Sequence, residues 1–89
     1  MIIPTFEFDA EANGYISEPF TIDERCTAHI ELASRAPVVT LKREEDGGYA
    51  NYGQTPKTAC GYEIDIFTKR EETIKLATPV EVKKCYIIN

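Results

Sequence analysis

The chain has 89 residues, of which 43% are apolar, and a formal net charge of −5. This length fits one domain, and the apolar content excludes a disordered chain. The acidic balance excludes a nucleic-acid backbone or an anionic membrane as the main partner, because both attract basic proteins. We therefore expect a single domain over residues 1–89.

The N-terminal residues show no basic segment followed by a long apolar run, so the sequence predicts no secretion signal. No apolar run approaches the roughly 20 residues that a membrane-spanning helix needs. Residues 1–5 are interpreted as an extended N-terminal arm that can add a strand to a neighbouring subunit. Alternation over Phe6–Phe8 predicts a first strand, and a turn at 12–14 leads to a second at Tyr15-Ile16.

Apolar residues occupy even positions at Phe20 and Ile22 and again from Cys26 through Leu32, with polar residues between them. A period of two places one set on the core face of a strand, so residues 26–33 form the clearest predicted strand. A turn at 34–37 follows, and the β-branched segment 38–42 predicts another strand with Val39 and Leu41 facing inward.

Residues 44–48 are a polar hairpin tip in which Asp46-Gly47 supplies the positive φ of a tight turn. Strands are predicted to follow at 49–52, 62–66 and 74–76, with a loop at 53–61 and a charged turn at 69–72. The last strand begins at Val80, and its alternation slips at Lys83-Lys84. A slip of one residue is typical of a β-bulge.

These elements predict an all-β fold, a single-domain two-sheet β-sandwich of about seven or eight short strands without a helix. Immunoglobulin-like and jelly-roll topologies give the same alternation. The sequence therefore leaves the strand order open.

Three cysteines without a repeated spacing indicate free thiols in a reducing compartment, and a Cys26–Cys85 bridge is the open alternative. His29 is the only histidine, and it has no serine or cysteine partner at motif spacing. Cys26 and His29 would point to opposite faces of one strand, which excludes a shared zinc site. The acidic clusters match no calcium loop. We therefore expect no enzymatic activity, no catalytic or metal-binding residue and no cofactor.

Tyrosines and amides gather between residues 49 and 57. A tyrosine offers apolar area and a hydroxyl, which suits protein contacts and sugar stacking alike. The candidate interface comprises Tyr49, Asn51, Tyr52, Gln54 and Lys57, while core packing of the tyrosines is the competing interpretation.

The order of segments over residues 20–88 resembles the small β-sandwich structural proteins of tailed-phage particles. The resemblance is carried by Val38-Val39-Thr40-Leu41-Lys42-Arg43, Asp46-Gly47-Gly48, Tyr62-Glu63-Ile64-Asp65-Ile66, Thr73-Ile74-Lys75-Leu76-Ala77 and Val80-Glu81-Val82. It implies a non-enzymatic virion component, first a head-decoration or auxiliary capsid protein and next a tail or connector protein. Its expected partners are other capsid or virion proteins, with a homo-oligomer also open, and its expected location is the virion and, during assembly, the host cytoplasm.

The residues around Tyr52 favour a second hypothesis, a carbohydrate-binding β-sandwich module. A glycan is then the partner. Both hypotheses describe a binding module rather than an enzyme.

Overall fold

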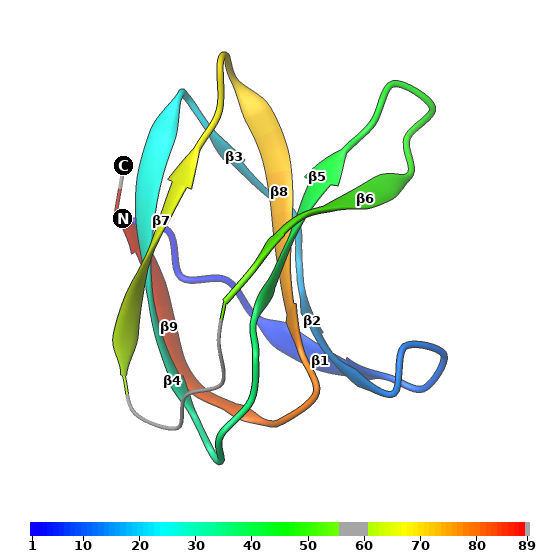
Figure 1. Ribbon diagram of the computed structural model, residues 1–89, viewed down its shortest axis with the longest axis vertical. Coiled ribbons are helices and arrows are strands. Elements are labelled where there is room, and N and C mark those ends of the chain that lie inside the picture. Colours follow the sequence, from blue (N-terminus) through cyan, green and yellow to red (C-terminus); the bar gives the residue numbers. More distant parts are fainter. Residues whose placement is uncertain (56–60, 89) are drawn as a thin grey trace.

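The computed structural model describes residues 1–55 and 61–88, and of Tyr62 only the backbone. Two layers of antiparallel strands face each other, and no helix occurs in these residues (Figure 1). The predicted two-sheet β-sandwich is thus confirmed. The strands are β1 (Phe6–Asp9), β2 (Gly14–Ser17), β3 (Phe20–Ile22), β4 (Arg25–Leu32), β5 (Val39–Arg43), β6 (Tyr49–Gln54), β7 (Tyr62–Phe67), β8 (Glu72–Thr78) and β9 (Val82–Ile88).

The large sheet has the order β1-β2-β8-β5-β6, and β3 pairs with β8 beyond the end of β2. Strands β2 and β3 therefore act as one interrupted strand along the same edge of β8. At the interruption the buried Ser17 hydroxyl accepts the backbone N–H of Leu76 at 2.9 Å and donates to the Glu18 carbonyl at 3.0 Å. A side chain thus replaces the ladder bond that the interruption removes, and counting the two pieces separately gives nine strands in the described residues.

The small sheet has the order β7-β4-β9. Strand β4 alternates as predicted, and its even-numbered residues are buried. The register between β4 and β9 shifts so that Glu31 pairs with Lys84 and Leu32 with Val82. Lys83 is the extra residue, which confirms the predicted bulge at the lysine pair.

The core lies between the two sheets and contains residues from both. Burial of this apolar surface is the main stabilising term of the fold. The core residues are Phe20, Ile22, Cys26, Ala28, Ile30, Leu32, Ala36, Val38, Ile64, Ile66, Ile74, Leu76, Cys85 and Ile87. Cys26 and Cys85 are both free thiols, so the alternative of a bridge between them is wrong.

The predicted inward orientation of Val39 and Leu41 is wrong. Val38 and Thr40 are buried instead, while Val39 and Leu41 are half-buried on the opposite face of the sheet. Pairing decides the orientation, because Thr40 lies opposite the fully buried Leu76 of β8. Val39 and Leu41 are the more apolar set, so alternation by itself selects the wrong face here.

The β5–β6 hairpin has the predicted tip, in which Gly47 adopts φ of 90° and donates to the Glu44 carbonyl at 3.0 Å. Strand β6 continues through Gly53 and Gln54, which the sequence assigned to a loop. These two residues pair with Thr40 and Val39, and this pairing extends the strand.

The N-terminal residues lie against their own domain beside β9 (Figure 1). The Ile2 N–H donates to the Ile87 carbonyl at 3.0 Å, and the Ile87 N–H donates to the Ile2 carbonyl at 2.7 Å. Pro4 is buried. Residues 1–5 thus cross from the edge of the small sheet to the start of β1.

Candidate functional site

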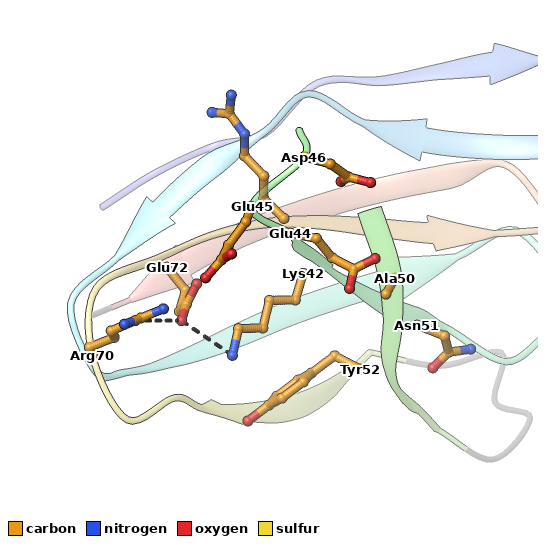
Figure 2. Close-up of a pocket in the computed structure, with 10 residues that line it drawn as sticks. Lys42, Glu44, Glu45, Asp46, Ala50, Asn51, Tyr52, Arg70 and Glu72 are labelled. Atoms are coloured by element: carbon orange, nitrogen blue, oxygen red, sulfur yellow. Dashed lines mark hydrogen bonds and ion pairs between the residues drawn. The ribbon is translucent and has the colours of Figure 1, made fainter. Parts of the chain in front are cut away.

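A groove of about 540 Å³ opens beneath the β5–β6 hairpin, and we call it the hairpin groove (Figure 2). Its walls come from the two hairpin strands, the hairpin tip and the start of β8. The lining residues are Lys42, Arg43, Glu44, Glu45, Asp46, Ala50, Asn51, Tyr52, Arg70 and Glu72.

The groove is a continuation of the inner face of the large sheet. Along β5 the inward positions are Thr40 and then Lys42, and along β8 they are Ile74 and then Glu72. The hairpin projects away from the small sheet at this end (Figure 1), so the inner face there has no opposite layer. The inward side chains accordingly change from apolar to charged, as exposure to water requires.

Two cationic side chains meet at one carboxylate in the groove. Glu72 Oε1 lies 3.2 Å from Lys42 Nζ and 3.3 Å from Arg70 Nε. The Glu72 side chain is 11% exposed and the Lys42 side chain 32% exposed, so water screens this pair only in part, whereas the Arg70 side chain is 78% exposed. The network holds the start of β8 against the hairpin and gives the groove its shape.

Tyr52 is a bulge residue that links the two sheets. Thr40 pairs with Gly53 and Leu41 pairs with Asn51, which leaves Tyr52 as the extra residue of β6. Its hydroxyl donates to the Phe67 carbonyl at the end of β7, at 2.5 Å. Lys42 Nζ lies 5.1 Å from the centroid of its ring, within the range of a cation–π contact.

The predicted interface residues do not form one surface. Asn51 and Tyr52 both line the hairpin groove, but the Asn51 side chain points away from Lys42 (Figure 2). Tyr49 lies beneath Lys75, whose Nζ is 4.3 Å from its ring centroid. Gln54 lines a separate cleft between β6 and β7. Lys57 lies outside the described residues.

The outer face of the small sheet carries His29 between two carboxylates. Its Nδ1 lies 2.9 Å from Glu63 Oε1, its Nε2 lies 3.0 Å from Glu31 Oε2, and its ring stacks on Tyr86 with centroids 4.8 Å apart. These hydrogen bonds, first that to Glu31 and then that to Glu63, raise the pKa of His29 above 6.5. His29 lies on the predicted polar face, but its side chain is only 17% exposed.

Large apolar side chains are exposed on this same outer face. Ile2 and Ile87 point into the domain, so their neighbours point outward. Met1 is 86% exposed, Ile3 69%, Ile88 52% and Phe67 63%. We call Met1, Ile3, Phe67, Tyr86 and Ile88 the outer apolar set.

The outer apolar set is not among the surfaces that the sequence predicts. The alternation over residues 62–66 predicts that the residue after Ile66 points outward, which was a usable signal for Phe67. Met1 and Ile3 carry no such signal, because only the single bridge between Ile2 and Ile87 determines their orientation.

Burial raises the pKa of the Cys26 thiol to about 11, with a smaller contribution from Asp65, and raises that of Cys85 to about 12. Both thiols are therefore protonated and unreactive at neutral pH. In residues 1–55 and 61–88 no group of three or more His, Cys, Asp or Glu side chains is placed to hold a metal ion. The same residues contain no helix able to span a membrane.

Comparisons with protein-family models, with curated proteins and with solved structures find no match to this chain.

Proposed function

We propose that the chain is a non-enzymatic structural protein of a tailed-phage virion that decorates or stabilises the capsid through protein–protein contacts. The phage assignment rests on the order of segments over residues 20–88, which is similar to that of small virion β-sandwich proteins. Contact with protein is supported by one observation in particular, the outer apolar set, of which all members but the half-buried Tyr86 are exposed.

Exposed apolar side chains on one face favour a protein partner because contact removes their surface from water. Tyr86 and His29 add stacked rings to this face, and aromatic residues are enriched where proteins meet. A repeated lattice needs little affinity at each contact, since many contacts act together. An 89-residue sandwich suits that role.

Mass spectrometry of virions purified on a density gradient tests the proposal. The protein is expected in a fixed ratio to the major capsid protein in intact particles. Absence from particles, with the protein present in the infected-cell lysate, would refute it.

A carbohydrate-binding module is the second candidate, favoured by the position of Tyr52 in the hairpin groove with polar side chains around it. Sugar binding by the ring predicts glycan-array signals that Tyr52→Ala abolishes and Tyr52→Phe retains, because phenylalanine keeps the stacking surface. A blank array, or equal signals from both variants, would contradict this candidate.

A further inference from the structure

The sheet edges of the described chain differ in how well they are protected. Strand β3 pairs with β8 on one side and is only three residues long. Strand β9 has two lysines, a bulge and the Ile2 bridge. Strand β6 has the Tyr52 bulge, and β1 is only four residues long. Strand β7 is six residues long, contains no proline, lysine or arginine, and pairs with β4 without a register shift. It is the edge best suited to accept another strand.

The register shows which backbone groups this edge presents. The Thr68 N–H donates to the Glu24 carbonyl at 2.7 Å, so the hydrogen-bonded pairs of the β4–β7 ladder fall on even residues of β7. Bonded and non-bonded pairs alternate in an antiparallel ladder, and odd residues therefore point their N–H and C=O groups outward. The Phe67 carbonyl accepts a hydrogen bond from the Tyr52 hydroxyl. In the described residues, the outward N–H and C=O groups of Glu63 and Asp65 have no backbone hydrogen-bond partner.

The side chains of β7 define what such a strand must carry. Glu63 and Asp65 are exposed on the outer face. Each gives one carboxylate oxygen to β4, through His29 and Thr27, and a carboxylate has further acceptor positions. On the inner side a cleft of about 240 Å³ between β6 and β7 is lined partly by Ile64 and Ile66.

We infer that the β7 edge binds an extended segment with lysine or arginine on one face and apolar residues on the other. Basic side chains at alternate positions lie beside Glu63 and Asp65, and the apolar side chains enter the cleft beside Ile64 and Ile66. A second copy of β7 is a poor occupant, because it places acids opposite acids. This inference goes beyond the virion proposal and does not depend on it.

The test uses the full chain and synthetic peptides of alternating lysine and valine, observed by amide hydrogen exchange in NMR spectra. Binding is expected to slow exchange of the Glu63 and Asp65 amides by about fivefold or more, the effect of one ordinary hydrogen bond. Two further peptides of equal charge are N-methylated, one on its odd-numbered residues and the other on its even-numbered residues. Only one of them can still form the ladder, so only one is expected to protect these amides.

A charge-reversed variant, Glu63→Lys with Asp65→Lys, is expected no longer to bind the lysine–valine peptide and to bind a glutamate–valine peptide instead. The control variant, Glu44→Lys with Glu45→Lys at the hairpin tip, has the same net charge and is expected to bind as wild type does. Protection by both N-methylated peptides, no protection at all, or equal loss in both charge variants would overturn the inference. Presence of the protein in virions is decided separately, so the two proposals can fail independently.

Discussion

Ser17→Ala tests how the large sheet tolerates the interruption between β2 and β3. The Ser17 hydroxyl is the acceptor for the Leu76 N–H, and Ser17 is 3% exposed. Alanine removes the acceptor and admits little water, so this N–H is left buried without a partner.

Leaving a buried donor unpaired costs about 1–3 kcal/mol, and we expect about 2 kcal/mol for Ser17→Ala. In a domain of this size that loss lowers the Tm by roughly 8–16 °C. It is also a substantial part of the roughly 5–10 kcal/mol that stabilises a small domain.

Urea unfolding followed by circular dichroism measures the free energy of unfolding of Ser17→Ala and of a control, Thr21→Ala. Thr21 and Thr73 share an exposed hydrogen bond of 3.3 Å between their hydroxyls, so the control is expected to change stability by at most about 0.5 kcal/mol. A Ser17→Ala variant as stable as the control would refute the assignment of Ser17 as the replacement ladder acceptor.

Three further predictions concern single side chains. The hydrogen bonds that raise the pKa of His29 stabilise the fold fully below pH 6.5, and this stabilisation is lost as the pH rises through the raised pKa. The difference in unfolding free energy between wild type and His29→Gln should therefore shrink over that rise, and a constant difference would contradict the prediction. Tyr52→Phe frees the Phe67 carbonyl to water and should cost about 0.5–1 kcal/mol in urea unfolding, whereas no loss would exclude a contribution from that bond. In a variant whose third cysteine is replaced by serine, Cys26 and Cys85 should react with a thiol reagent at pH 8 only in urea, and rapid labelling of the native protein would contradict their burial.

The sequence predicted those strands in which apolar and polar residues alternate without interruption. The clearest case is the strand predicted over residues 26–33, which the structure places at Arg25–Leu32. The bulge at Lys83 was visible as a slip in the alternation of the last strand. The orientation of Val39 was predicted wrongly, because Val39 and Leu41 are more apolar than Thr40 and Lys42, whereas pairing with β8 places Thr40 on the core face.

The candidate surfaces were harder to predict because they depend on contacts between distant segments. The hairpin groove exists because Lys42 and Glu72, thirty positions apart, share the inner face of the large sheet where it lies uncovered. The bulge at Tyr52 directs that ring into the groove, whereas Tyr49 faces Lys75 outside it. Tyr49 and Tyr52, which are close in the sequence, therefore lie on two different faces of the fold.

We propose that this protein acts through protein contacts made by the outer face of its small sheet. The most direct measurement is the amount of an Ile3→Ser, Ile88→Ser variant retained on purified particles, relative to wild type. The control is Phe8→Ser, which removes an exposed apolar side chain of the large sheet. We expect that the double variant folds but is lost from particles while the control is retained, and equal retention of both would contradict the proposal.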